Sequence, residues 1–260
     1  MAEHIVPNAL PLLEYDPTER GIIDPRAFTY GEPLPPHAVL CFFADRLRLL
    51  AERGELVHVT DMGTEMGPMP IYTLERQGRR VVVMQPGVGG PLVAGVVEEL
   101  WARGCDRFVV CGGCGVLDRQ VAAGHLLLPT EALRDEGTSY HYLPAARWVE
   151  PTPRALQALR DELEARGLAY LPCSTWTTDA FFRETPAKVA YRREHDGCLA
   201  VEMEAATLFA VARFRRLELA QVLYAGDDVS GLEWDARAWD GRHDLREALI
   251  YLAADAVLRL

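Results

Sequence analysis

The sequence lacks any concentration of positive charge. Its 260 residues include 27 Lys and Arg against 38 Asp and Glu, a formal net charge of −11 at pH 7, and the basic residues are scattered along the chain. A nucleic acid is held by a basic field, so we expect no nucleic-acid partner. No apolar run is long enough to cross a bilayer, and Met1 to His4 supply neither the basic nor the apolar part of a secretory signal. We therefore expect a cytoplasmic protein with no membrane partner.

Metal-binding patterns are also missing. The chain has six cysteines, and the one close pair, Cys111 and Cys114, is joined by two glycines. This pair permits a redox or zinc interpretation, but no second pair follows at zinc spacing. A chain of this length does not depend on disulfides, so we interpret the cysteines as reduced core residues. No His, Cys or carboxylate cluster has ligand spacing, and we expect no metal and no organic cofactor.

What is present is enough apolar sequence for one core, since 49% of the residues are hydrophobic. Residues 1–37 are rich in proline and acidic residues and predict an extended N-terminal arm that wraps the domain or reaches a neighbouring subunit. Residues 38–260 alternate short β-rich runs with amphipathic segments, which predicts a single α/β domain. The predicted strands are 38–43, 56–60, 71–74, 81–84, 107–111, 169–173 and 217–224, and the predicted helices are 45–53, 92–103, 153–166, 204–214 and 245–258. The clearest unit, 81–111, is a βαβ crossover, so we expect a mostly parallel sheet covered on both faces.

Two glycine-rich segments follow neighbouring predicted strands, at residues 87–91 and 112–115. Ligands of such sheets gather at the carboxyl ends of strands, and glycines let backbone N–H groups approach an anion. The first segment lacks the spacing of a dinucleotide site and the lysine of a P-loop. Each segment alone is equally typical of a tight turn, so both interpretations stay open.

Two pairs of acidic residues are the other candidates. Glu202 and Glu204 flank Met203 where a strand gives way to a helix, and a carboxylate there can accept hydrogen bonds from the vicinal hydroxyls of a ribose. The alternative is that they complement the helix dipole while Met203 fills the core. Asp227 and Asp228 follow an apolar strand. One of two close carboxyls can keep its proton near neutral pH and act as a general acid, although a solvated turn is the common alternative.

Aromatic residues provide a third candidate feature. Trp176, Phe181 and Phe182 lie in or beside a Ser/Thr-rich segment, residues 174–180, that we expect to be a loop. Aromatic rings on a polar loop offer a stacking surface for a flat base, or form a hydrophobic plug beneath the loop.

Taken together, these motifs occur in the order found in the purine and uridine nucleoside phosphorylases, and the chain from about residue 38 to its end resembles a divergent member of that superfamily (phosphorylase family 1). The motifs are GVGGP at 87–91, VCGGCGVL at 110–117, RDEGTS at 134–139 with YLP at 142–144, VEMEAA at 201–206 and DDVSG at 227–231. The resemblance implies a central mixed sheet flanked by helices and a homo-oligomer, a hexamer, trimer or dimer. It also implies a pentosyltransferase of purine salvage, which cleaves a nucleoside with inorganic phosphate to the free base and ribose 1-phosphate.

The resemblance also implies a role for individual residues. Asp227 would be the general acid, with Asp228 as the alternative. The implied ribose contacts are Glu204, Met203, Glu202 and, from a neighbouring subunit, His4, and the implied base contacts are Cys114, Gly115, Trp176 and Phe181.

The sequence departs from the family at the phosphate site. Val110 matches a family arginine, Gly113 matches a Ser or Thr, and residues 42–45 replace a glycine-containing turn. The candidates for anion contacts are Gly89, Gly113, Arg46 and Arg48, with Arg80, Arg134 and Arg183 as further candidates. The loss fits hydrolysis by water as well as a rebuilt phosphate site, and a nucleoside-binding protein without turnover is a third hypothesis. Thr185 and Ala187 stand where uridine phosphorylases carry the Gln and Arg that bind uracil, which favours a purine over uridine.

Overall fold

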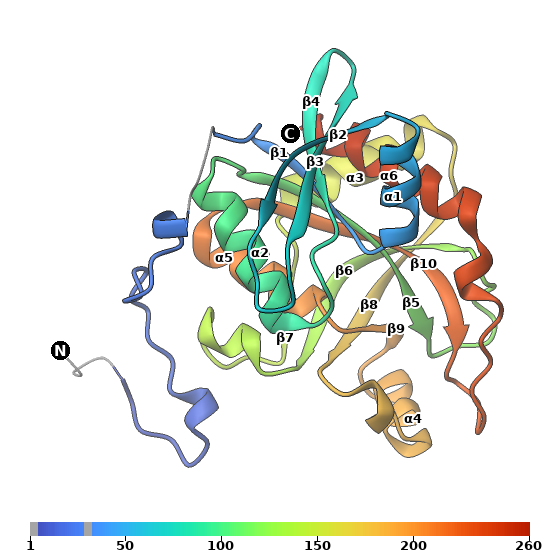
Figure 1. Cartoon of the computed structure of the whole chain (residues 1–260). Helices are drawn as coiled ribbons and strands as arrows, with labels where there is room; N and C mark the ends of the chain where they lie inside the picture. The colour runs from blue at the N-terminus through green and yellow to red at the C-terminus, as the bar shows by residue number, and fades with distance from the viewer. Residues whose placement is uncertain (1–4, 29–32) are drawn as a thin grey trace.

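The domain is built on one mixed β-sheet, shown in the computed structural model of Figure 1, which describes residues 5–28 and 33–260. The strands are β1 (His37–Cys41), β2 (Leu56–Met62), β3 (Met69–Arg76), β4 (Arg79–Met84), β5 (Arg107–Val116), β6 (Leu126–Asp135), β7 (Trp148–Val149), β8 (Tyr170–Thr178), β9 (Cys198–Glu202) and β10 (Glu218–Asp228). The helices are α1 (Ala44–Glu52), α2 (Gly90–Ala102), α3 (Pro153–Ala165), α4 (Pro186–Glu194), α5 (Ala205–Arg215) and α6 (His243–Val257). The strand order is β10-β6-β8-β9-β5-β1-β4-β3-β2, with β7 paired to β6.

The centre of the sheet is parallel and buried on both faces. β1 pairs in parallel with β4 on one side and with β5 on the other, so the predicted βαβ crossover is confirmed, with β1 lying between its two strands. All five residues of β1 are buried, as expected for a strand covered on both faces. One apolar core contains residues of α2 and α5, and a second contains residues of α1, α3 and α6. The expected α/β class, a central mixed sheet flanked by helices, is confirmed.

One side of the sheet closes on itself. β10 pairs in parallel with β5 and antiparallel with β6, so β10, β6, β8, β9 and β5 form a closed ring. β5 and β9 are antiparallel and pair only through Gly115 and Val116 with Val201 and Ala200. The carboxyl ends of β5 and β9 therefore cross each other. Because of this crossing, the ends of two strands that run in opposite directions lie close together.

Two segments that we expected to be loops are strands. Residues 112–115 continue β5 and pair with β10, and residues 174–178 continue β8. The pairing partners, which lie far away in the sequence, stabilise these glycine- and Thr-rich segments in extended form. The elements that sequence analysis did not assign are β6, β7 and α4, and it expected β9 only as a strand that ends before α5. Within β6 the pairing shifts register between Pro129 and Glu131, as is usual where proline interrupts a strand.

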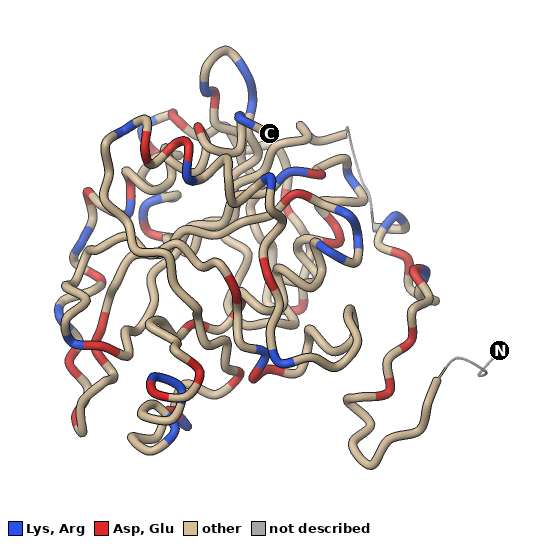
Figure 2. Tube along the Cα trace, turned by 180° about the vertical axis from the view of Figure 1, so that it is seen from behind, with Lys and Arg blue, Asp and Glu red and all other residues tan. Residues whose placement is uncertain are grey.

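Residues 5–28 run along the outside of the domain as an extended trace (Figure 1). The Arg215 guanidinium donates a hydrogen bond of 2.7 Å to the Glu19 carbonyl oxygen, which joins this segment to the end of α5. Basic and acidic residues are interspersed along the trace in Figure 2, in agreement with their scatter in the sequence. Across the described ranges, no helix has the length and apolar character needed to span a membrane.

Candidate active site

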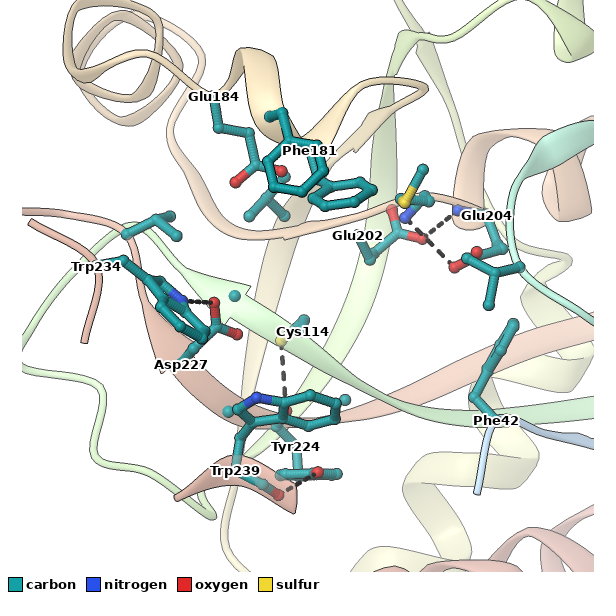
Figure 3. A pocket seen from close by; sticks show the side chains of 18 of the residues that line it. Phe42, Cys114, Phe181, Glu184, Glu202, Glu204, Tyr224, Asp227, Trp234 and Trp239 are labelled. Atoms are coloured by element: carbon teal, nitrogen blue, oxygen red, sulfur yellow. Dashed lines mark hydrogen bonds between the residues drawn. The ribbon is translucent and has the colours of Figure 1, made fainter. Parts of the chain in front are cut away.

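A cavity of about 820 Å³ lies where the tips of β1, β5, β9 and β10 meet (Figure 3). Residues 181–186 and 229–239, together with Val88 and Arg246, contribute its remaining walls. It brings together most of the residues that the sequence singled out: Gly113, Cys114, Gly115, Phe181, Glu202, Met203, Glu204 and Asp227. His4 lies outside the described residues.

Glu204 sits between β9 and α5 and is only 6% exposed. One carboxyl oxygen accepts a hydrogen bond of 2.6 Å from the Gly89 N–H, and the other accepts one of 3.3 Å from the Met203 N–H. Burial and the neighbouring Glu202 raise the pKa of Glu204 to about 8. Near neutral pH this group is therefore mostly a carboxylic acid, which can both donate to and accept from a pair of hydroxyls.

Glu202 has a different role from the one expected. Its Oε1 accepts hydrogen bonds from the hydroxyls of Thr177 (2.7 Å) and Thr175 (3.3 Å). Its Oε2 accepts from the N–H groups of Glu204 (2.7 Å) and Ala205 (2.6 Å), at the start of α5. The predicted ribose contact is corrected for Glu202, because each of its oxygens accepts two hydrogen bonds within the protein, as in the helix-dipole alternative, whereas each oxygen of Glu204 accepts only one.

The side chains of the two adjacent aspartates lie in different environments. Asp227 lines the cavity, and its Oδ2 accepts a hydrogen bond of 2.7 Å from the Trp234 indole N–H (Figure 3). Asp228 is buried away from the cavity, where it accepts a 2.8 Å hydrogen bond from the Ser230 N–H and pairs with Arg237 at 2.5 Å. Although burial opposes it, these partners hold the pKa of Asp228 below its usual value. The prediction of Asp228 as the alternative general acid is therefore wrong. Neighbouring side chains of a strand point to opposite sides, and here only Asp227 points to the cavity.

Trp176 does not contact the cavity either. It is fully buried within β8, its indole N–H donates a 2.9 Å hydrogen bond to Asp135, and Lys188 lies 5.1 Å from its ring. The expected base contact is corrected, because strand pairing carries this ring into the core. Phe181 does line the cavity and is 52% exposed.

Sequence analysis missed Trp234 and Trp239, which line the cavity from the 229–239 loop. Tyr224 donates a 2.8 Å hydrogen bond to the Trp239 carbonyl oxygen and so ties this loop to β10. The signal was available, because both are aromatic residues in a polar loop just after the Asp227 motif, the same pattern that singled out Trp176.

Glu184 is a second acid on the Asp227 side of the cavity (Figure 3). Burial, and then the charge of Asp227, raise its pKa to about 7. Glu184 can therefore hold a proton near neutral pH, which is what a general acid requires. It follows loop 179–183 without a recognisable motif, and no sequence signal identified it.

Most of the expected anion contacts are not available. The Gly89 N–H is engaged by Glu204, Arg46 pairs with Asp45 at 2.8 Å, and Arg48 is exposed on α1. None of these three residues lines the cavity, whereas Gly113 does. The contacts predicted for Gly89, Arg46 and Arg48 are corrected, because Gly89 and Arg46 are engaged by acidic side chains and Arg48 faces the outside of the domain.

Most of the ionisable side chains that line the cavity are acidic. Among its described lining residues, the acidic side chains are Glu184, Glu202, Glu204, Asp227 and Glu233, and Arg246 is the one arginine or lysine. Arg246 comes from α6, and sequence analysis missed it. Sequence analysis also missed Gln221, although it is the one polar residue in the apolar run from Leu219 to Ala225.

The cysteines do not form a redox centre in this site. All six are free and buried. Burial raises the pKa of Cys114 well above its usual value, and the contact with Cys41 together with burial does the same for Cys111. A redox or metal-binding cysteine needs the opposite shift, so these thiols stay protonated.

The crossing strand tips of this α/β sheet bring the Glu204 carboxyl, a second acid and aromatic rings into one cavity. This combination is typical of enzymes that act on a small molecule with a ring and hydroxyl groups. The profile of the phosphorylase superfamily matches residues 36–254, and the chain belongs to this superfamily.

Individual relatives agree with this assignment. The guanosine phosphorylase of Halorubrum lacusprofundi is 29% identical over 222 residues, which span 83% of this chain and 89% of that protein. The crystal structure of an AMP nucleosidase from Bacteroides thetaiotaomicron superposes with a TM-score of 0.66 at 26% identity and covers 86% of this chain and 87% of that one. The purine nucleoside phosphorylase of Toxoplasma gondii shares the fold, with a TM-score of 0.74 at 19% identity over 87% of this chain and 92% of that one.

Proposed function

We propose that this protein is a nucleoside phosphorylase, a pentosyltransferase that converts a purine nucleoside and inorganic phosphate into the free base and ribose 1-phosphate. The observation that carries the proposal is that Glu204 and Met203 face one cavity together with Asp227 and Glu184. A nucleoside needs these two groups at once: one for its sugar hydroxyls and one for its departing base. The guanosine phosphorylase that spans most of this chain supports the same activity.

The chemistry follows from the charges that develop in the reaction. As the glycosidic bond breaks, the sugar gains oxocarbenium character and the base gains negative charge. A proton donated to the base lowers the barrier. In the proposed mechanism Asp227 passes this proton to the base, and Glu184, whose pKa is raised to about 7, supplies it to Asp227. Glu204 holds the sugar hydroxyls while Met203 packs against the ring.

A purine is favoured over uridine. Thr185 accepts a hydrogen bond from the Lys188 N–H and caps α4, and neither Thr185 nor Ala187 is among the residues that line the cavity. The positions that bind uracil in uridine phosphorylases thus serve helix formation in this chain. Trp234 and Phe181 offer the aromatic surface for the wider base.

The test is base release from guanosine, inosine, adenosine and uridine, followed by chromatography with and without phosphate. We expect phosphate-dependent release of purine bases together with ribose 1-phosphate. Release at the same rate without phosphate would reject phosphorolysis.

Hydrolysis is the second candidate, and a specific observation favours it. Val110 and Gly113 lack the phosphate ligands that the family resemblance predicts, and most of the ionisable side chains that line the cavity are acidic. The similarity to an AMP nucleosidase points the same way. If neither reaction occurs, the protein is a nucleoside-binding protein, and Asp227→Asn would then leave nucleoside affinity unchanged.

We further propose that the protein is a cytoplasmic homo-oligomer. Val57 (61% exposed), Val59 (44%) and Met66 (70%) lie on and beside β2, the strand at the edge of the sheet. Apolar residues grouped on an edge strand are typical of a subunit interface. Sedimentation velocity measures the state, and a monomer would contradict this proposal.

A further inference from the structure

One end of the cavity carries an exposed apolar surface. We call it the apolar rim and define it by Phe181, Phe182, Leu232 and Trp234, all of which line the cavity. Their exposed fractions are 52%, 88%, 90% and 65%, in that order. Single exposed apolar residues are common on a protein surface, but a group of them around one opening indicates a binding surface.

Both walls of the apolar rim are held in place by short-range contacts. Phe181 and Phe182 are consecutive residues of one 3-10 turn, and their ring centres lie 4.0 Å apart at an angle of 42°. The other two rim residues lie in loop 229–234, which two backbone hydrogen bonds between Asp228 and Asp235 close, at 2.8 and 3.1 Å. The rim is therefore a preformed surface, so a ligand that binds there loses little affinity to ordering of the loop.

The apolar rim lies at the end of the cavity where the base is expected. Trp234 donates its indole N–H to Asp227, and Phe181 lies beside Glu184, whereas Glu204 lies at the opposite end (Figure 3). In the proposed reaction Asp227 protonates the departing purine, and nitrogen 7 is the acceptor that shares the five-membered ring with the broken bond. The substituent at position 6 lies on the same edge of a purine as nitrogen 7. A group at position 6 therefore points toward Glu184 and the rim.

The cavity is also larger than an unsubstituted nucleoside requires. Its volume of about 820 Å³ lies in the upper part of the range of about 300–1,000 Å³ that is typical of sites for drug-sized molecules. Phe182 and Leu232 extend the surface outward from the aromatic residues proposed to contact the base, and neither has a side chain that can form a hydrogen bond. The group that this part of the rim can bind is therefore apolar.

We propose that the substrates of this protein are purine nucleosides with an apolar substituent on the 6-amino group, and that the apolar rim binds this substituent. The inference rests on the proposed function and names its substrate class. Contact of the substituent with Phe182 and Leu232 removes apolar surface of both partners from water, which supplies affinity. An amino group with one substituent keeps one N–H, which can donate a hydrogen bond to Glu184. The substituent takes no part in the bond changes, so the reaction at C1′ is that of the unsubstituted nucleoside.

The experiment compares adenine with 6-benzylaminopurine by calorimetric titration of each into the purified protein. Both are free bases, the product class of the proposed reaction, so the comparison does not depend on turnover. We expect 6-benzylaminopurine to bind about tenfold more tightly or better, because its benzyl ring is buried against the rim. Leu232→Ser should lower this preference about threefold and leave the affinity for adenine unchanged, since less apolar surface is buried. The matched control is Leu168→Ser, an apolar residue of 40% exposure outside the cavity, which should keep the full preference.

A second measurement separates a ligand-binding rim from a contact between subunits. Sedimentation velocity compares the wild type with Leu232→Ser, and we expect the same assembly for both. Equal binding of the two bases by the wild type would overturn the inference. So would a smaller assembly of Leu232→Ser with an unchanged preference, which would assign the rim to an interface between copies of the chain. A preference for 6-benzylaminopurine without base release from its riboside or from adenosine would instead refute the proposed activity and leave the binding role of the rim in place.

Discussion

Two groups of residues in the same cavity differ in how the chain supplies them. The first group consists of the acidic residues Glu184, Glu202, Glu204 and Asp227, and most of these come from two short motifs at strand tips. A second group, Phe42, Phe43, Gln221 and Arg246, comes from the segment after β1, from β10 and from α6. A motif concentrates several functional groups within a few residues and is visible in a sequence, whereas an assembled site has no local pattern. Substitutions in the two groups test this difference, and the largest expected effect is that of Asp227.

Asp227→Asn should lower the rate of base release by about 100-fold to 10,000-fold, because the amide cannot supply the proton. Nucleoside affinity should change little, since the amide keeps the shape of the side chain. Steady-state and binding measurements separate the two quantities. The paired variant Asp228→Asn removes the charge that faces Arg237, and should lower the thermal midpoint while leaving the rate close to wild type. Equal losses of rate in both variants would contradict the separation of these two residues.

Glu202→Ala should lower the free energy of unfolding by about 3 kcal/mol, because it leaves the N–H groups of Glu204 and Ala205 and two threonine hydroxyls without their partner. Urea unfolding measures this loss. Glu204→Gln, two residues away, should instead act mainly on nucleoside KM. If Glu202→Ala were as stable as wild type, the role of Glu202 as acceptor for the first N–H groups at the start of α5 would be contradicted.

The pH dependence of stability should differ between the wild type and Glu204→Gln. Its pKa in the folded protein, about 8, lies above the ordinary value of 4.5, so the folded state binds this proton more tightly than the unfolded chain does. The resulting stability is fully present below about pH 4.5 and is lost as the pH rises through about 8. Between pH 5 and pH 8.5, the wild type should therefore lose more than about 1 kcal/mol relative to Glu204→Gln in urea unfolding. A constant difference across this range would contradict a buried, protonated Glu204.

The smallest effect concerns the two tryptophans. Trp234→Phe should reduce the rate of base release severalfold, because Asp227 loses a hydrogen bond of about 1 kcal/mol. Trp176→Phe should affect stability and leave nucleoside KM unchanged, because its indole bonds to Asp135 in the core. If Trp176→Phe raised the nucleoside KM, the assignment of Trp176 to the core and not to the base site would be contradicted.

The agreement between sequence and structure follows the same division. The βαβ unit of β4, α2 and β5 was predictable because its periodicity is local, and β1, α1 and α6 were located within two residues at each end. β6 and α4 were not assigned, β9 was expected only as a strand of undefined length before α5, and the Thr-rich end of β8 was expected to be a loop. In the three strands the pairing partners lie far away in the sequence, so pairing, and not local preference, decides the conformation.

By itself, the amino-acid sequence determined the α/β class, the family and the motif residues Met203, Glu204 and Asp227, because hydrophobic periodicity and short motifs depend only on near neighbours. The tertiary structure alone decided which of two adjacent acids faces the cavity, that Trp176 is buried, and that Gln221 and Arg246 share the cavity with Glu204. The reason is that a closed ring of strands with mixed directions sets side-chain direction and proximity through contacts between distant segments, and these contacts are not encoded within any one of them.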